Sequence, residues 1–557
     1  MSEKDYDKEE AGTAITSRAS PGGKYEGQVD EGIASHEDLH RKLKPRQISM
    51  IALGCVALFQ PPCGAIGTGL VIGSGSGLVR GGPVGLFLAY VIMGFACFAT
   101  MCSLGEQATF LPHKKGFSGY ASRFVDPALG FALGWIYLAK YLIVTPNNIV
   151  AAAIVISYWT DKVPAGAWIA IFLVGCICLN VLGVKLFGHI EYVLSAFKVV
   201  VLTGLILLGI IIDLGGAGVE RIGFRHWKNK PFGEYLYEGT LGRFTGVWSC
   251  FVVALFAYMG SELVGVTFGE AKNPRKTIPK TIKQTLFRLL FFYVGSIFVV
   301  SLLLRCDDPL LIAATKKSTG ASASPFVVAI ELAGINALPD IINASILMFV
   351  LSAANSDLYV GSRTLYALAA EGHAPRFFMR TNRFGTPYFA SAFCSAVCCI
   401  AFLAVSSGSK VVFNYFVATA TMAGALTWAT IMFSHLAMQR AMKAQGIPRS
   451  ELPWQAPFQP YMTYIALFIT VVVAIFKGFD AFTITFNHKT FITHYFLLPC
   501  FFLAFFGYKL IRKTKWIRPE DVDLVTGRRE FDADEAAWEA EKPTGKQALW
   551  RRIFNSA

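Results

Sequence analysis

The sequence predicts an all-α integral membrane protein with about 12 transmembrane helices. Of its 557 residues, 54% are hydrophobic and only 16% are charged, whereas a soluble globular domain carries about 25% charged residues. The mean hydropathy of +0.48 agrees with this balance. Most apolar residues fall into long runs, and helices are the spanning structure that satisfies the backbone of such runs in lipid. A disordered or collagenous chain is excluded, since 46 Phe and 10 Trp are too many for either.

Twelve apolar runs are long enough to cross ~30 Å of hydrocarbon as helices. They occupy residues 48–78, 83–110, 128–157, 165–183, 191–214, 245–268, 286–304, 340–370, 388–406, 411–437, 461–479 and 491–511. Residues 47–511 therefore form one twelve-helix core. The polar segment 1–46 is expected to be a disordered tail without a cleavable signal peptide, and 512–557 to be a second tail.

The placement of Lys and Arg near the ends of the runs predicts the orientation. If the N-terminus is cytoplasmic, cytoplasmic segments hold 24 of these residues and the opposite loops hold 12. This two-to-one bias places both tails in the cytoplasm. The net charge of +14 is thus explained by membrane topology, and we expect the lipid bilayer, rather than nucleic acid, as the partner of this chain.

The sequence gives no sign of an enzyme, a metal site or a cofactor. Most of the 12 Cys lie inside apolar runs and lack the spacing of a disulfide framework. Buried small hydrophobes are the favoured interpretation over metal ligands, because no His or carboxylate lies close to the Cys groups. The glycine-rich segment 73–77 is followed by neither the strand nor the lysine of a phosphate-binding loop.

The first apolar run contains a helix-breaking segment at Gly67-Thr68-Gly69. Glycines can simply let helices pack closely. They also remove the side chains that keep a helix wound, and backbone N–H groups at the start of a half-helix bind a carboxylate well. We favour an unwound binding segment, as found in the discontinuous helices of secondary transporters.

The sixth run carries Glu262 about midway along it, shortly after Gly260. An ionisable group at that depth is costly unless it is partnered or protonated, which marks it as a candidate proton carrier. The alternative is a protonated structural carboxyl group bonded to a helix carbonyl. Lys198 in the fifth run is too deep to reach the interface easily. It is a second candidate for proton coupling, and the alternative is an interhelical link to a carbonyl.

Weaker polar groups interrupt two further runs. Pro146-Asn147-Asn148 breaks the third run and either lines a pocket or relieves a kink. Four polar residues at helical spacing lie in the eighth run: Ser352, Asn355, Ser356 and Asp357.

Several strings taken together resemble a known family. They are IGTGL at 66–70, GE at 105–106 with LP at 111–112, YASRFVDPALG at 120–130, IGFRHW at 222–227, GEAKNPR at 269–275 and SAANSDLYVGSRTLY at 352–366. The chain resembles the fungal amino acid permeases, the yeast amino acid transporter group of the amino acid–polyamine–organocation superfamily. The resemblance extends over about residues 41–520.

The resemblance implies a five-plus-five inverted repeat with interrupted helices 1 and 6, and an amino acid bound between them. Amides around Ile66, Gly67, Thr68 and Gly69 would hold the substrate carboxylate. Carbonyls around Phe256 and Tyr258, next to Gly260, would hold the amino group, and the Phe256 ring would close over it. Glu262 and Lys198 match the family's proton-linked groups, which implies proton-coupled amino acid uptake by alternating access. A transporter-like sensor with little transport is the alternative.

Two departures from the family pattern stand out. Nine residues, Cys55 to Cys63, separate strings that the family joins directly, which indicates either a gene-model artefact or a genuine insertion. Asn148 occupies a position where many relatives carry Glu, which favours neutral or broad-range amino acids. The resemblance also implies a plasma-membrane location and ubiquitin attachment in the first tail, where the candidate acceptors are Lys4, Lys8 and Lys24.

Overall fold

The computed structural model describes most of the predicted core and part of the second tail. The predicted first tail with Lys4, Lys8 and Lys24, the segment Cys55 to Cys63 and Ile66 lie outside the described residues. The described residues are 67–111, 116–160, 162–181, 184–218, 220–266, 274–316, 324–335, 337–382, 385–483 and 485–526. They all belong to one compact unit within residues 40–557.

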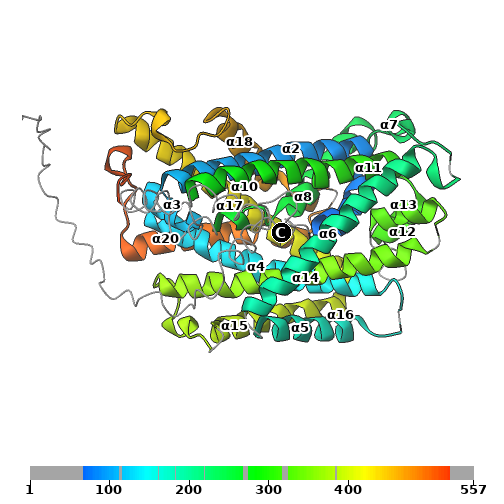
Figure 1. Ribbon diagram of the computed structural model, residues 1–557, viewed down its shortest axis with the longest axis horizontal. Coiled ribbons are helices and arrows are strands. Elements are labelled where there is room, and N and C mark those ends of the chain that lie inside the picture. The colour runs from blue at the N-terminus through cyan, green and yellow to red at the C-terminus, as the bar shows by residue number, and fades with distance from the viewer. Residues whose placement is uncertain are drawn as a thin grey trace, which may run out of the picture. The chain divides into compact units, whose positions relative to one another are not determined.

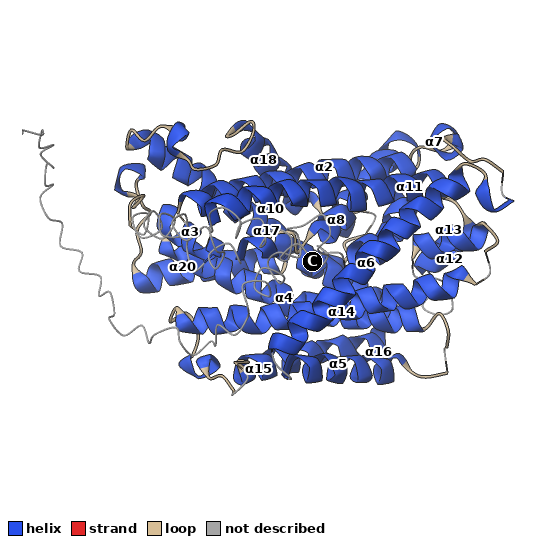
Figure 2. Cartoon of the chain, viewed as in Figure 1, coloured by secondary structure: helices blue, strands red, loops and turns tan. Residues whose placement is uncertain are grey.

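Every regular element in the described ranges is a helix, as Figure 2 shows, and no strand occurs in them. The longer helices are α2 (Ser74–Phe110), α4 (Pro127–Ile156), α5 (Ala165–Val181), α6 (Val184–Asp213), α8 (Gly239–Tyr258), α10 (Pro274–Arg288), α14 (Leu338–Ala370), α15 (Tyr388–Cys398), α17 (Ser409–Ala444), α18 (Tyr461–Phe476) and α20 (Leu497–Arg512). The shorter helices are α3 (Gly116–Phe124), α7 (Arg225–Asn229), α9 (Leu263–Val266), α11 (Gly295–Leu303), α12 (Pro309–Lys316), α13 (Pro325–Leu332), α16 (Leu403–Ser407) and α19 (His488–Tyr495).

The helices confirm a polytopic membrane fold. In the described residues, nine helical units are long and apolar enough to cross a membrane, and the bent pair α19 and α20 makes a tenth. The shorter apolar helix Ala165–Val181 coincides with the predicted fourth span. The last of the twelve predicted spans is accounted for by the unit Gly69–Phe110, whose 42 residues are too many for one crossing at 1.5 Å per residue.

Gly82 divides this first unit into two runs. Its φ of 74° and ψ of 173° are not helical, and Pro83 follows it. A Cβ atom at Gly82 would lie 2.4 Å from the backbone nitrogen of Gly233, so glycine is required both by the backbone angle and by the close approach. Residues 69–81 are therefore the described part of the first span, and residues 83–110 are the second span.

The sixth predicted span is broken. Helix α8 ends at Tyr258, Gly260 has a φ of 95°, and the one-turn helix α9 begins at Leu263. The seventh predicted span is part of a longer helix. Helix continues from Pro274 through a π-helical turn at Leu289–Val294 to Leu303, whereas hydropathy predicted 286–304. Helix α10 has four basic residues in its first ten, and polar helical turns carry no hydropathy signal.

Helix α4 lies at the centre of the packing. It contacts α14, α17 and α20, and Figure 1 shows α4 and α14 side by side. Helix α2 packs along α8, so the spans that contain the two breaks are neighbours.

Large apolar side chains point outward on several helices, for example Ile511 (81% exposed), Val200 (70%) and Phe468 (68%). Such an apolar exterior is expected where lipid is the solvent.

Candidate functional site

A small cavity lies where the two broken spans meet α4 and α14. Its volume is about 60 Å³, which is room for only a few water molecules. Its wall consists of Gly67, Thr68, Gly69, Lys140, Tyr141, Val144, Asn148, Phe256, Ala257, Met259, Gly260, Leu263, Ala353, Ser356 and Asp357. Six predicted site residues therefore come together here: Gly67, Thr68, Gly69, Asn148, Phe256 and Gly260.

The first broken span reaches the cavity with its helix start. Gly67 is not helical, and helix begins at Thr68 with a π-helical turn at Gly69–Gly73. The first N–H groups of a helix have no partner within it, so this end suits a carboxylate. A Cβ atom at Gly69 would lie 2.5 Å from the Cα of Ala257. The two broken spans therefore touch backbone to backbone.

The sixth span contributes Phe256 and Gly260 to the wall, but Tyr258 is not among the cavity residues. The Tyr258 hydroxyl points into the bundle and donates to the carbonyl of Tyr90 at 2.8 Å. The Tyr258 carbonyl accepts from the N–H of Ser261 at 3.3 Å. The position of Tyr258 thus favours a structural role for its side chain in clamping α8 to α2.

Glu262 is buried at the break and has three polar partners. It forms an ion pair with Lys140 of α4. It also accepts from the indole N–H of Trp428 at 3.2 Å and from the N–H of Gly260 at 3.1 Å. The predicted alternative, a carboxyl group bonded to a helix carbonyl, does not describe this arrangement, because every partner is a donor.

Lys140 was missed by the sequence prediction. Its ammonium lies 4.8 Å from the centre of the Tyr141 ring and 5.1 Å from that of Tyr137, so aromatic faces assist Glu262 in holding the charge. A signal existed, because Lys140 lies within the third apolar run. Lys198 was singled out because an ionisable residue deep in a span is a functional candidate by default. The same criterion applies to Lys140.

Asn148 links the first span to α14. Its side-chain oxygen accepts from the Thr68 hydroxyl at 2.9 Å, and its side-chain nitrogen donates to the Asp357 carboxylate at 2.7 Å. Asp357, which the sequence placed among weaker polar groups, therefore borders the cavity directly.

Lys198 of α6 lies away from the cavity wall. Its ammonium donates to the Ser352 hydroxyl at 2.8 Å and lies 3.8 Å from a carboxylate oxygen of Glu191. The Ser352 hydroxyl also contacts both Glu191 oxygens, at 2.9 and 3.0 Å. Ser352 directly precedes Ala353 of the wall, so this cluster stands behind the cavity and joins α6 to α14.

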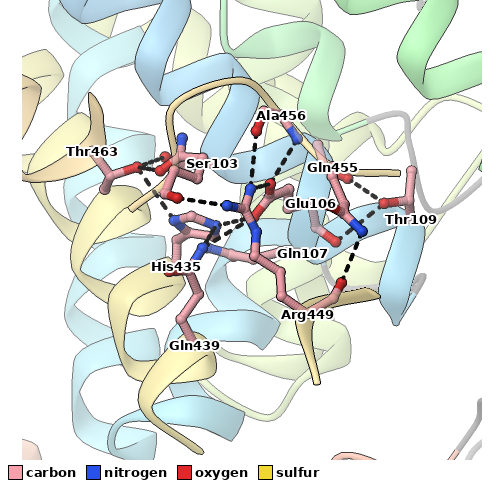
Figure 3. Close-up of polar contacts among 12 residues, drawn as sticks. Ser103, Glu106, Gln107, Thr109, His435, Gln439, Arg449, Gln455, Ala456 and Thr463 are labelled. Atoms are coloured by element: carbon pink, nitrogen blue, oxygen red, sulfur yellow. Dashed lines mark hydrogen bonds and ion pairs between the residues drawn. The ribbon is translucent and has the colours of Figure 1, made fainter. Parts of the chain in front are cut away.

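A second buried polar cluster surrounds Glu106, whose side chain is fully buried (Figure 3). One carboxylate oxygen accepts from Arg449 at 2.6 Å and from the N–H of Ala456 at 2.7 Å. The other lies 2.7 Å from His435 and accepts from Gln439 at 3.1 Å. This cluster ties the end of α2 to α17 and to the segment before α18, far from the cavity residues in sequence.

The family follows from comparison with known proteins. The family model described as "Amino acid permease" matches residues 57–518. The chain belongs to the amino acid permease family. It is 47% identical over 91% of its length to a dicarboxylic amino acid permease of Saccharomyces cerevisiae, of which the match covers 83%.

Other relatives of this permease have different names. A lysine-specific permease of S. cerevisiae is 39% identical over 94% of the chain and 84% of the relative. A probable proline-specific permease of Schizosaccharomyces pombe is 40% identical over 86% and 88%. The relatives are permeases and not enzymes, so the present permease is an integral membrane transporter of amino acids.

The fold of the permease also agrees with a solved structure. A manganese transporter of Eremococcus coleocola, solved in complex with an aromatic bis-isothiourea substituted compound, aligns with a TM-score of 0.50 and 14% identity. The alignment covers 87% of this chain and 94% of the other. At that identity the likeness concerns the fold, and it supports the twelve-helix transporter architecture.

Proposed function

We propose that this permease takes up amino acids together with protons by alternating access. The observation that carries the proposal is the cavity between two broken spans, whose wall includes Lys140 and Asp357, with Glu262 paired to Lys140. Ionisable groups are retained at such a depth only where they are paired or take part in transport.

Six of the site residues expected from the sequence line this cavity, which supports the proposed substrate contacts. The N–H groups around Gly67, Thr68 and Gly69, together with Ile66, would receive the substrate carboxylate. Carbonyls around Phe256 and Tyr258, with Gly260 in the break, would receive the amino group. A cavity of about 60 Å³ is too small for a solvated amino acid. Its walls must therefore separate to load substrate, as alternating access requires.

Proton coupling is proposed to involve Glu262 and Lys198. Protonation of Glu262 would cancel its attraction to Lys140, leaving the ammonium at the cavity wall free to meet another anion. Lys198 would link proton binding to the packing of α6 against α14. It contacts Ser352 of α14, and Ser352 in turn contacts Glu191 of α6. Both roles depend on the charge of the side chain. Neutral variants of similar size therefore distinguish these roles from a role in helix packing.

Two substrate classes are proposed. Asn148 in place of a carboxylate favours neutral or broad-range amino acids. Acidic amino acids are the second candidate, favoured by the 47% identity to a permease named for dicarboxylic amino acids and by the Lys140 ammonium in the wall.

We also propose a plasma-membrane location with both tails in the cytoplasm, and ubiquitin attachment at Lys4, Lys8 or Lys24. Replacing these three lysines by Arg should prolong residence at the cell surface. Unchanged turnover of the triple variant would remove them as acceptors.

The decisive experiment is uptake into liposomes that contain the purified full-length chain. Radiolabelled alanine, proline, lysine and glutamate are offered with and without an inward proton gradient. We expect gradient-driven accumulation of at least one of them, accompanied by alkalinisation outside. Binding without accumulation would favour the sensor alternative, and gradient-independent accumulation would contradict proton symport.

A further inference from the structure

Asp357 differs from Glu262, Glu106 and Glu191 in the ions that surround it. Glu262 has Lys140, Glu106 has Arg449, and Glu191 has Lys198 within 3.8 Å. In the described part of the chain no Lys or Arg nitrogen lies within 4.0 Å of Asp357, and the neutral amide of Asn148 donates a hydrogen bond to it. Its contacts therefore do not commit Asp357 to one protonation state.

Asp357 also borders the cavity, together with Ser356 and Ala353 on the same face of α14. Charged and titratable groups on three neighbouring helices interact electrostatically with it. These are Lys140, Tyr137 and Tyr141 from α4, Lys198 and Glu191 from α6, and Cys398 from α15. Glu262 from the break in the sixth span pairs with the same Lys140. Both lysines among them already serve other carboxylates.

The amide of Asn148 can serve either state of Asp357, because it has a donor and an acceptor end. In the structure its nitrogen donates to Asp357, and its oxygen accepts the Thr68 hydroxyl. A protonated Asp357 carries one O–H donor and keeps one acceptor oxygen. The new O–H can bond to Asn148 only through the amide oxygen, so this pairing turns the amide toward Asp357. Its nitrogen then faces Thr68, whose hydroxyl hydrogen must leave Asn148 and point to another acceptor.

We propose that Asp357 is a second proton-binding carboxylate of the transport cycle and that Asn148 relays its protonation to Thr68. One proton adds to the Asp357 carboxylate, and no bond other than hydrogen bonds changes. The freed Thr68 hydroxyl then becomes a donor for the substrate carboxylate at the helix start. Proton binding thus prepares the substrate site. The inference rests on the proposed symport and adds a residue to it.

The test measures substrate affinity against pH for the purified full-length chain, and proton flux in liposomes. Coupling to one proton changes affinity by at most about tenfold per pH unit. We expect the wild type to lose affinity on the alkaline side. In Asp357→Asn we expect a slope smaller by the share of one proton, and one proton fewer carried per substrate molecule. Asp340→Asn makes the same change at the exposed end of α14 and should behave as wild type.

A second variant tests the relay even if Asp357→Asn does not fold. Thr68→Val keeps the shape and removes the donor, so the slope of affinity against pH should fall by the share of one proton, as in Asp357→Asn, and Thr68→Ser should restore it. A wild-type slope in Asp357→Asn overturns the proton site, and a wild-type slope in Thr68→Val overturns the relay. Transport by the wild type without proton flux would instead refute the proposed symport itself.

Discussion

The ammonium of Lys140 and the carboxylate of Glu262 form an ion pair whose side chains are only 2% and 1% exposed. Removing one member of such a pair leaves an uncompensated buried charge, at a cost of about 3–5 kcal/mol. We therefore expect Glu262→Gln to lower the thermal stability of the detergent-purified protein strongly. The double variant Lys140→Gln with Glu262→Gln should recover most of that loss. Equal stability of the single and double variants would contradict the pairing.

Lys198→Met should uncouple transport from protons, because it removes the ammonium that contacts Ser352 and Glu191. It keeps the apolar stem, so the helical fold should be preserved. The measurement is the ratio of proton to substrate flux in liposomes. Ser352→Ala removes the hydrogen bond from Lys198 and the one to Glu191, each worth about 1.5–3 kcal/mol. It keeps the Lys198 charge and should therefore change the flux ratio less. Lys162→Met at an exposed position is the control. An unchanged flux ratio in Lys198→Met would leave Lys198 as an interhelical link.

Gly69→Ala should impair transport far more than Gly67→Ala. A Cβ atom at Gly69 would lie 2.5 Å from the Ala257 backbone, whereas at Gly67 the nearest atom is 3.9 Å away, the Cβ of Ala353. Forcing an extra methyl group into a packed site costs about 1–3 kcal/mol, which corresponds to roughly a 5- to 150-fold change in an equilibrium. Uptake rates at equal surface expression give the comparison. Similar rates for the two variants would mean that the broken spans move apart to admit the methyl group at Gly69 without a free-energy cost that slows transport.

Arg449→Ala should loosen the segment that precedes α18. Glu106 would lose its cation, and the Arg449 bonds to the carbonyls of Ala456 and Gln459 would also be lost. Hydrogen bonds to charged groups contribute about 1.5–3 kcal/mol. We expect faster hydrogen exchange over 449–460 in the variant. Arg440→Ala, at an exposed position on α17, should exchange as wild type does. Unaltered exchange in Arg449→Ala would show that His435 and Gln439 hold Glu106 without the cation.

Hydropathy predicted the membrane fold well because long apolar runs leave helices as the one option in lipid. It did not predict that the helix of the seventh span begins before the apolar run, because the basic turns of α10 are polar and yet helical. Breaks at Gly67 to Gly69 and at Gly260 were predictable because glycine marks interrupted spans. Glu262 was also singled out correctly as a buried ionisable group, but its partner was not, since Lys140 is 122 positions away.

Other site features depend on contacts that no local pattern encodes. Asp357 meets Asn148 across 209 positions, and Arg449 meets Glu106 across 343. Tyr258 shows a limit that is local. Its neighbours Phe256 and Gly260 line the cavity, but Tyr258 does not. The backbone changes direction at the break, so residue type alone does not predict which of these residues faces the cavity. The sequence thus predicted which segments matter more reliably than which side chains face the cavity.

The cavity wall contains two kinds of residues. Its glycines Gly67, Gly69 and Gly260 all come from the broken spans, whereas Asn148 and Asp357 come from α4 and α14. A codon change replaces a side chain but leaves a peptide group in place. Groups common to every amino acid can therefore be recognised by atoms that mutation does not remove. Selectivity can drift on the opposite wall, as the dicarboxylic, lysine and proline names of the relatives suggest it has done within this family.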